Sequence, residues 1–586
     1  MKFDFHYEIL VHIQDLLAFG ELSICLYDDC GRFPKQSTPY LDHVFDFSAK
    51  VQMHGLSFTL LIAVQEILAV PFSSYTGYGQ PSFPPPASIP SKFTILHTND
   101  IHAHLDEFSK GGTDCRQGDI TNNTCYGGIA RMKTVIDQYR QNTSDVILLD
   151  AGDQFQGTLF FTYFKAGPSA QLMNTLEYDA MTLGNHEFDA GEEYLSEFIS
   201  SLDFPVISAN MDLTKSKLKD SHVKPYIVLD KYKLGIIGFI TNTTGEITMG
   251  TKDIVFTDPI QVVQRKIDEL HSMGIKRIIA VSHNGYFADQ DLARGTRGLS
   301  LIVGGHSHSL LLKDLTQSGV VGPYPTNVTN LDGKQTFIVQ AHRYGDYLGH
   351  LELTWSEQDE LLSLVGDPIL LDQTIAQDKT IHAQVQALRS NFTELTHQTV
   401  AFSTRDFPVC SKDPECAMGE LIADCMLESQ VGTRATIAWT NIGGIRASFP
   451  AGNVTVADVL TTLPFGNTVV SYEATGQDII DTIEGVVRGQ NIKTGKRIIS
   501  NPQWAGLRYS YTASPAKVNQ LTIKGSNIVP GNKYKVLTND FTAAGGDSII
   551  APVTFTTGDV MADVVTECIK KRKTISPTVD GRISRS

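Results

Sequence analysis

The sequence predicts an α/β protein, α+β overall, with a layered N-terminal domain, a helical connector and a smaller C-terminal α/β domain. A chain of 586 residues is too long for one ordinary core, so two large domains are expected. From Lys92 to about residue 370, short apolar runs rich in β-formers alternate with stretches of helical periodicity. That alternation indicates strands covered by helices in layers.

Three segments precede the first predicted strand. Residues 1–52 show no signal-peptide pattern, and we interpret them as an extended start, with translation beginning at Met53. Residues 53–72 contain a short apolar core that resembles a secretory signal, although an N-terminal anchor is the alternative. Residues 73–91 are rich in Pro, Ser and Gly and predict a flexible leader.

Charge and modification patterns favour an exported protein that does not bind nucleic acid. The net charge is −16, and no long basic run is present. The C-terminal sequence VDGRISRS is polar and carries no lipid-anchor signal. Six sequons fit an extracellular glycoprotein, at Asn122, Asn142, Asn242, Asn327, Asn391 and Asn453.

Eight cysteines include two close pairs, Cys115/Cys125 and Cys410/Cys416. Metal binding is possible for such pairs, but no CxxC spacing occurs, so we expect local disulfides.

Five buried strands are predicted between residues 92 and 370, at 93–97, 146–150, 180–183, 277–282 and 299–304. Helical spacing appears at 129–141 and 260–274. We place the N-terminal domain at 92–370, a helical linker at 371–398 and the C-terminal domain at 399–586.

Residues that can bind metal follow each of the five strands. In chain order they are Asp100 and His102, Asp153, Asn185 and His186, His283, and His306 with His308. Ligands of open α/β sheets bind beyond the carboxyl ends of the strands, so we expect these loops to converge. Carboxylates, imidazoles and an amide suit Zn²⁺, Mn²⁺ or similar ions. The donors are too many for one tetrahedral site, which predicts two metals sharing a carboxylate.

The stretch LGNHEFDAG, residues 183–191, illustrates why the whole set matters. Alone it is equally compatible with a capped loop. Together with the other four strand endings it predicts one crevice.

The strings D-x-H, G-D-x-x, G-N-H-E-F-D, S-H-N-G and G-G-H-S-H resemble the calcineurin-like metallophosphoesterases and, more narrowly, the 5'-nucleotidase/apyrase family, over residues 92–582. This resemblance implies two divalent ions per chain, with zinc favoured over Mn, Mg or Ca. It assigns one ion to Asp100, His102, Asp153 and His308. It assigns the other to Asp153, Asn185, His283 and His306. Many relatives carry Asn or Gln at the position of His308.

The expected chemistry is attack on phosphorus by a water whose pKa the two cations lower. We expect His186 to donate a hydrogen bond to the developing charge or the leaving oxygen, and Asp189 to orient it. Gln156 is an equally good candidate for orienting the attacking water or for capping its loop.

Five residues of the C-terminal domain are candidates for substrate binding. By themselves, the aromatics near turns would be assigned to the core. The resemblance implies that Phe465 and Phe541 sandwich a nucleobase, Asp547 binds the ribose and Arg446 binds the phosphate. Asn441, which lies with Arg446 around a glycine turn, is assigned to substrate binding with them.

The stretch CSKDPECAMGEL, residues 410–421, departs from the family pattern. Ser411 replaces an Arg, Glu420 replaces an Asn, and the loop is one residue longer. We expect Lys412 to supply the missing cation. Ala423 and Ala438 stand where a second family disulfide has cysteines, which leaves Cys425 and Cys568 without a family partner.

The sequence therefore predicts a secreted, metal-dependent hydrolase of nucleoside mono-, di- or triphosphates. Hydrolysis of AMP to adenosine and phosphate is the first expectation. A secreted apyrase that acts on ATP and ADP is the alternative. An inactive nucleotide-binding ectoprotein is the alternative from another class.

Overall fold

A computed structural model describes residues 48–53, 56–61, 91–248, 250–411, 414–429 and 434–585. The chain forms two units, Met1–Pro84 and Pro85–Ser586. In the first, β1 (Ser48–Met53) pairs antiparallel with β2 (Leu56–Leu61). The rest of the predicted start and apolar segments, almost all of the leader, and Lys412 lie outside the described residues. Within them, no helix is long and apolar enough to cross a membrane.

Two sheets build the domain that the sequence places at 92–370. The first has the order β20-β19-β3-β6-β7-β8, with β21 beside β19. Its strands are β3 (Lys92–Thr98), β6 (Val146–Asp150), β7 (Ala180–Thr182), β8 (Val206–Ile207), β19 (Tyr347–Trp355), β20 (Leu361–Gly366) and β21 (Ile369–Leu370). Neighbours β3, β6, β7 and β8 run parallel.

The second sheet has the order β10-β11-β13-β14-β18-β17. Its strands are β10 (Tyr226–Leu229), β11 (Leu234–Ile240), β13 (Arg277–His283), β14 (Leu301–Gly304), β17 (Thr326–Thr329) and β18 (Gln335–Val339). Short pairs lie outside the two sheets: β4 (Phe108–Ser109) with β5 (Cys125–Tyr126), β9 (Met211–Asp212) with β12 (Val255–Phe256), and β15 (Leu310–Leu311) with β16 (Val320–Gly322).

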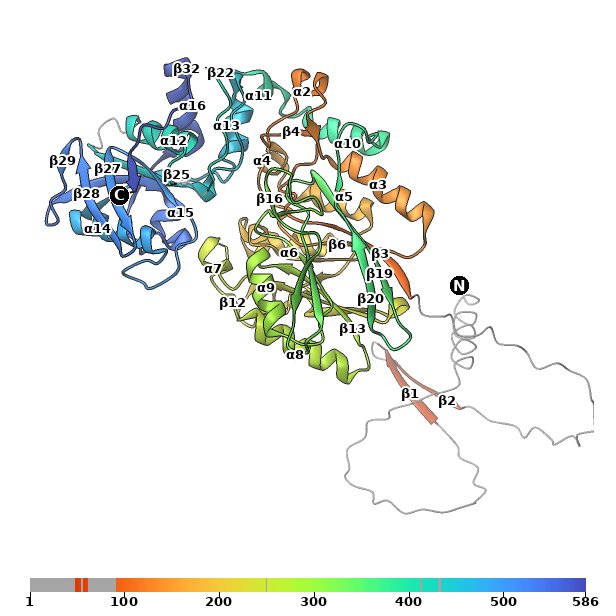
Figure 1. The fold of residues 1–586 in the computed structure, drawn as a ribbon. Coiled ribbons are helices and arrows are strands. Elements are labelled where there is room, and N and C mark those ends of the chain that lie inside the picture. Colours follow the sequence, from red (N-terminus) through yellow and green to blue (C-terminus); the bar gives the residue numbers. More distant parts are fainter. Residues whose placement is uncertain are drawn as a thin grey trace, which may run out of the picture. The chain divides into compact units, whose positions relative to one another are not determined.

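The sheets share one apolar core, in which Ile95 and Ile147 of the first sheet cluster with Ile236 and Ile279 of the second. Each such side chain contributes about 1.5–3 kcal/mol when fully buried. Helices cover the outer faces: α3 (Ile129–Asn142), α4 (Leu159–Phe164), α5 (Gly167–Leu176) and α6 (Glu192–Ser200) on the first sheet, and α8 (Pro259–Ser272) and α9 (Tyr286–Gly295) on the second. Figure 1 shows α3 and α5 to one side of the strands and α8 to the other.

The predicted elements agree with this architecture to within two residues at most ends. All five predicted strands are present, as β3, β6, β7, β13 and β14, and the two predicted helices are α3 and α8. Helix α8 begins where expected because the Asp258 side chain accepts a hydrogen bond from Ile260 N and Pro259 occupies the first turn. The segment predicted as a helical linker, 371–398, contains two helices, α10 (Lys379–Arg389) and α11 (Thr393–His397).

The C-terminal region contains three further sheets. The five-stranded sheet β26-β23-β30-β25-β31 is flanked by β29-β28-β27-β33 and β24-β22-β32. Their strands are β22 (Thr399–Ser403), β23 (Ile437–Asn441), β24 (Gly452–Thr455), β25 (Thr468–Thr475), β26 (Pro502–Ala505), β27 (Leu507–Ala513), β28 (Ala516–Ile523), β29 (Ser526–Asn527), β30 (Lys533–Asn539), β31 (Thr556–Val560), β32 (Thr574–Ile575) and β33 (Ile583–Arg585). The helices are α12 (Ala417–Glu428), α13 (Val456–Thr462), α14 (Gly476–Arg488), α15 (Asp540–Ala543) and α16 (Met561–Arg572).

Three disulfides are present among the described residues. The predicted pairs Cys115–Cys125 and Cys410–Cys416 are confirmed. Cys425 and Cys568, which the sequence left without a partner, bond to each other, with their Cα atoms 5.5 Å apart. This bond joins α12 to α16. Cys25 and Cys30 lie outside the described residues.

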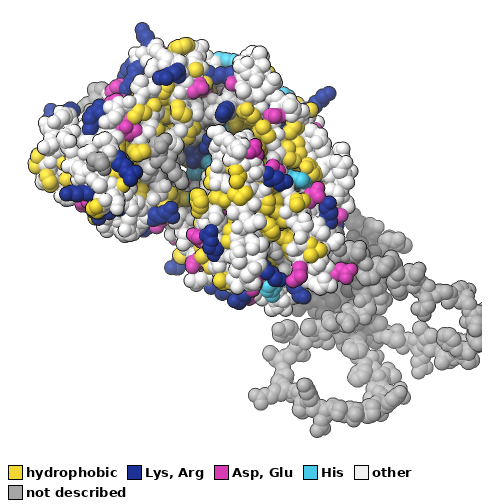
Figure 2. All heavy atoms as spheres, in the orientation of Figure 1, with side chains coloured by type: hydrophobic (Ala, Val, Ile, Leu, Met, Phe, Trp, Pro, Cys, Tyr) yellow, Lys and Arg dark blue, Asp and Glu magenta, His cyan; other side chains and the backbone are white. Residues whose placement is uncertain are grey.

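The surface mixes charges of both signs. On the face drawn in Figure 2, Lys and Arg side chains are scattered among acidic ones and gather into no broad basic patch.

Candidate active site

The predicted ligands form two adjoining clusters at the ends of strands from both sheets. Asp100, His102 and His308 make the first. His308 Nε2 lies 3.2 Å from Asp100 Oδ1 and 3.1 Å from His102 Nε2. The loops after β3 and β14 therefore meet, as the positions of their strand ends require.

Asp153, His283 and His306 make the second cluster. His283 Nε2 lies 3.1 Å from Asp153 Oδ2, and His306 Nδ1 lies 2.9 Å from the amide oxygen of Asn185. The same Asp153 oxygen is 3.7 Å from His102 Nε2 of the first cluster. Asp153 thus stands between the clusters, where the sequence predicts a shared carboxylate.

The backbone is turned sharply at most of these positions. Left-handed φ angles of 49° to 74° occur at Asp100, His102, Asp153, His306 and His308. Each such residue costs on the order of 1 kcal/mol or more, and strained residues of this kind concentrate at functional sites. Asp and His tolerate this conformation better than branched residues do.

A glycine allows the two central loops to approach. A Cβ atom at Gly184 would lie 2.2 Å from Asp153 Oδ1, so a larger residue would displace the shared carboxylate.

Backbone carbonyls fix the histidine rings. His102 Nδ1 bonds to Phe155 O at 3.0 Å, and His283 Nδ1 bonds to Ala151 O at 2.6 Å. Because Nδ1 donates to a carbonyl in both rings, each Nε2 faces the cluster, and in the neutral His102 ring this atom is an acceptor.

Sequence reasoning gave no role to Glu187, which proves central. Its carboxylate is fully buried and accepts hydrogen bonds from Gly184 N, Asp153 N and Gln154 N, at 2.6, 2.9 and 2.7 Å. It therefore clamps the loop after β6 to the loop after β7. Its position inside GNHEFD, between His186 and Asp189, is the sequence feature that could have identified it.

The charges of the site favour metal binding. Burial, followed by the charge of Arg446, holds the pKa values of His102 and His308 well below the usual range. Neutral imidazole is the form that binds metal. Burial lowers the pKa of His283, but Asp153 raises it to about 10, so that this pair attracts positive charge.

These observations test whether the residues suit a metal centre. In both clusters a buried ring nitrogen faces another acceptor at 3.1 Å. A divalent cation between such atoms satisfies both, and the donors combine imidazole, carboxylate and amide. The residues therefore fit two ions of the zinc or manganese kind.

His186 and Asp189 form a pair at the rim of the clusters. His186 Nδ1 lies 2.7 Å from Asp189 Oδ2, and Thr248 Oγ1 donates to the other carboxylate oxygen at 2.9 Å. Burial lowers the pKa of His186, but Asp189, followed by Asp153, raises it above the usual value. Asp189 thus holds the His186 ring through Nδ1, which leaves Nε2 available to a ligand.

Five of the candidate substrate residues line one cavity of about 220 Å³. His186 and Asn185, the latter beside the second metal cluster, also line it. The five that line it are Asn441, Arg446, Phe465, Phe541 and Asp547. Gln156 also lines it. The cavity thus brings together residues, such as Asn441 and Asp547, that are more than a hundred positions apart in the chain.

Asn441 and Asp547 are linked in a buried network. Asn441 Nδ2 donates to Asp547 Oδ2 at 2.7 Å, and Asn441 Oδ1 accepts from Asn539 Nδ2 at 2.9 Å. Burial raises the pKa of Asp547 to about 6, against the lowering effect of the Asn441 hydrogen bond. Both functional groups of the Asn441 amide are therefore occupied in orienting other side chains.

Arg446 reaches from the C-terminal domain to the first metal cluster. Its Nη2 lies 2.9 Å from His102 Nε2, and its guanidinium lies 5.7 Å from the centre of the Phe465 ring. Phe465 in turn stacks on His186, with ring centres 5.4 Å apart. Tyr344, which the sequence did not single out, donates from its hydroxyl to Arg446 O at 2.6 Å and fixes the base of this arm.

Comparisons with known proteins agree with this geometry. The calcineurin-like phosphoesterase family model matches residues 93–310, and the 5'-nucleotidase C-terminal domain model matches residues 394–554. The 5'-nucleotidase of Diplobatis ommata is 33% identical over 84% of this chain and 90% of its own length. The chain belongs to the 5'-nucleotidase family.

Two further relatives of the 5'-nucleotidase family extend the agreement. The 5'-nucleotidase of Homo sapiens is 33% identical over 86% of this chain and 92% of its own length. The crystal structure of a 5'-nucleotidase precursor from Thermus thermophilus is 34% identical, with a TM-score of 0.76, over 84% of this chain and 99% of that one. Family and fold together identify an enzyme, a phosphoric monoester hydrolase.

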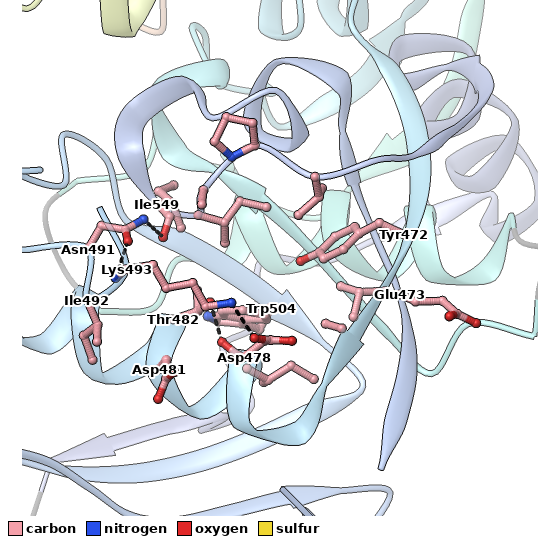
Figure 3. Close-up of a pocket in the computed structure, with 17 residues that line it drawn as sticks. Tyr472, Glu473, Asp478, Asp481, Thr482, Asn491, Ile492, Lys493, Trp504 and Ile549 are labelled. Carbon is pink, nitrogen blue, oxygen red and sulfur yellow. Dashed lines mark hydrogen bonds and ion pairs between the residues drawn. The ribbon is translucent and has the colours of Figure 1, made fainter. Parts of the chain in front are cut away.

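A second cavity, of about 130 Å³, lies in the C-terminal region of this 5'-nucleotidase family member. Ile549, two residues after Asp547, lines it together with Tyr472 and Trp504. Figure 3 shows Lys493 extended across it to an ion pair with Asp478. No predicted site residue lines this cavity.

Proposed function

We propose that this protein hydrolyses nucleoside 5'-monophosphates, with AMP first among them, to a nucleoside and phosphate outside the cell. One observation carries the proposal: the cavity that contains Phe465, Phe541 and Asp547 opens onto Asn185 and His306 of the metal clusters. A nucleoside bound by the two phenylalanines and Asp547 would have its 5'-phosphate beside Asn185 and His306. The relatives, which are named 5'-nucleotidase, favour this reaction over the apyrase alternative.

Seven residues would hold two divalent ions, for which zinc is our first choice: Asp100, His102, Asp153, Asn185, His283, His306 and His308. When bound, such ions supply an activated water at neutral pH and neutralise the charge of the phosphoryl oxygens. The protein's part is to hold the donors in position, through Glu187 and the carbonyls of Phe155 and Ala151.

His186 and Arg446 complete the reacting site in this proposal. His186, oriented by Asp189, donates a hydrogen bond from Nε2 to the charge that develops on the phosphoryl or leaving oxygen. Arg446 offers its planar guanidinium to the phosphate, because it already reaches His102 of the first cluster. Gln156 faces the same cavity and is placed to orient the incoming water.

Nucleoside recognition falls to the C-terminal domain. Phe465 and Phe541 are half-buried and line the same cavity, where aromatic rings can stack on a base. Asp547 offers a carboxylate to the ribose hydroxyls, and Asn441 holds it in place. Lys412 lies outside the described residues, and its role as a cation for the phosphate stays a prediction from the sequence.

The surface supports an extracellular location. The asparagines of all six sequons are exposed, at positions 122, 142, 242, 327, 391 and 453. Glycosylation requires such exposure. Three disulfides also suit an oxidising compartment.

Phosphate release from AMP, ADP, ATP and a UDP-sugar by the purified protein tests the proposal directly. We expect rapid release from AMP that a chelator abolishes and added zinc restores. Faster release from ATP and ADP than from AMP would favour the apyrase alternative. Absence of chelator-sensitive release from all four substrates would overturn the proposal.

A further inference from the structure

Three carboxylates meet in the C-terminal region, apart from the proposed catalytic residues. Glu415 lies in the loop closed by Cys410–Cys416, Glu420 in the first turn of α12, and Asp580 shortly before β33. One oxygen of each lies within 4.8 Å of an oxygen of the others. Two oxygens that bind the same Ca²⁺ at about 2.4 Å can be at most about 4.8 Å apart, so this spacing suits a single ion.

Glu420 is the buried member of the cluster, and one of its two carboxylate oxygens lacks a hydrogen-bond partner among the described residues. Only 3% of the residue is exposed. Its Oε2 has long contacts, 3.4 Å from Asp580 N and 3.6 Å from Arg582 Nε. Among the residues that the structure describes, Oε1 has no hydrogen-bond donor. A buried carboxylate oxygen in this state is costly unless a positive charge or a proton reaches it.

The nearby arginines are already engaged. Arg582 makes two hydrogen bonds of 2.8 Å to Asp424 and one of 2.9 Å to Asp580. Arg508 Nη2 lies 3.1 Å from the other oxygen of Asp580. Three carboxylates therefore share two guanidinium groups, and Glu415, which accepts a hydrogen bond from Ile583 N, adds a fourth negative charge, so negative charge is in excess. In agreement, burial raises the pKa of Glu420 to about 7; Arg582 opposes this shift, and the charges of Glu415 and Asp580 add to it.

We propose that Glu415, Glu420 and Asp580 bind a hard divalent cation of the Ca²⁺ class, at a site separate from the catalytic metals. All three donors are carboxylates, and the described residues add no imidazole or thiolate to the cluster. Oxygen donors of this kind prefer Ca²⁺ or Mn²⁺ to Zn²⁺. The remaining coordination positions fall to water and backbone carbonyls.

The bound ion has a structural consequence. It ties the Cys410–Cys416 loop and the start of α12 to the segment before β33, which pairs with β27. The stretch CSKDPECAMGEL departs from the family pattern at this place, through a longer loop and through Glu420 in place of Asn. The departure therefore adds a carboxylate at the centre of the proposed site.

Luminescence of Tb³⁺, a probe of Ca²⁺ sites, tests the proposal on the full-length, metal-loaded enzyme. Tyr509 N bonds to Arg582 O at 2.8 Å and Trp504 O accepts from Arg582, so two aromatic residues adjoin the cluster and can sensitise a bound lanthanide. We expect sensitised luminescence that Ca²⁺ suppresses. Glu420→Gln should weaken Tb³⁺ binding at least about tenfold, because it removes a charged ligand without changing volume.

Glu428→Gln is the matched control, since this residue lies on the same helix with a side chain 58% exposed. It should keep the luminescence, and Ca²⁺ should raise the Tm of this control and of the wild type but not of Glu420→Gln. If Glu420→Gln does not fold, Asp580→Asn, whose side chain is 45% exposed, decides in its place. Luminescence that survives these changes, or its absence from the wild type, overturns the proposal.

Discussion

The two proposed metal sites of this protein differ in both their donors and their construction. The catalytic clusters mix imidazole, carboxylate and amide, and loops at the ends of neighbouring strands carry the donors. The acidic cluster, which consists of Glu415, Glu420 and Asp580, has only carboxylates. They come from a disulfide loop, the start of a helix and a segment near the C-terminus. The first composition suits zinc and the second suits calcium.

The difference also concerns support. Several of the proposed catalytic ligands have neighbours outside the clusters that hold them, such as Glu187 behind Asp153 and Phe155 O behind His102. In the acidic cluster, Glu420 Oε1 lacks any such partner among the described residues. A preorganised site can do chemistry, whereas a site that relies on its ion for cohesion serves stability.

Replacing Asp153 should have the largest effect, because this residue stands between both catalytic clusters. Asp153→Asn should reduce AMP hydrolysis by about 10³-fold or more, since the cations supply several kcal/mol of transition-state stabilisation. Elemental analysis should show loss of catalytic metal, while Ca²⁺ still raises the Tm through the acidic cluster. Full catalytic metal content in this variant would contradict the shared-ligand role.

His186→Ala should reduce kcat by about 10²-fold and leave the metal content unchanged. The alanine keeps the backbone donor from residue 186 to Asp153 Oδ1, which is 2.9 Å long. Asp189→Asn should cost less, because it only weakens the orientation of the ring. Metal loss from His186→Ala would mean that the side chain supports the clusters rather than the reaction.

Phe541→Ala should raise KM for AMP by roughly 5- to 150-fold, the equivalent of about 1–3 kcal/mol of base stacking. Hydrolysis of p-nitrophenyl phosphate, which has no base, should be unaffected. Phe465→Ala should lower kcat as well, because Phe465 also stacks on His186. Equal effects of Phe541→Ala on both substrates would argue against a base-binding role.

The smallest expected effect is a dependence of thermal stability on pH that arises from Glu420 in the acidic cluster. The pKa of Glu420 is raised to about 7 in the folded protein, so the folded state binds this proton more tightly than the unfolded state does. Stability from this group is therefore present at low pH and is lost as pH rises from about 4.5 to 7. Without Ca²⁺, the wild type should lose a few degrees more of Tm over this range than Glu420→Gln does. Saturating Ca²⁺ should remove that difference, and parallel pH profiles without Ca²⁺ would contradict the prediction.

The catalytic region could be predicted because its information is local. Each ligand follows directly after a recognisable strand, and His186 and Asp189 are three residues apart. The convergence of the strand ends then follows from the geometry of layered sheets. The break between Arg389 and Thr393 inside the helical linker leaves little mark on the apolar pattern, so the sequence did not specify the number of helices.

Other features could not be predicted because they depend on contacts between distant segments. Nothing near Cys425 or Cys568 indicates that α12 and α16 pack together. The same holds for the bond between Asn441 and Asp547, and for the meeting of Glu420 with Asp580. Without the family resemblance, the aromatics Phe465 and Phe541 would have been assigned to the core.

The Cys425–Cys568 bond closes a covalent ring that contains Phe465, Phe541 and Asp547. A protease that cuts once inside this ring opens the loop without separating its ends. The nicked protein would migrate as one chain in a denaturing gel until a reductant was added. The linkage therefore keeps Phe465, Phe541 and Asp547 attached to the rest of the chain after a single cleavage.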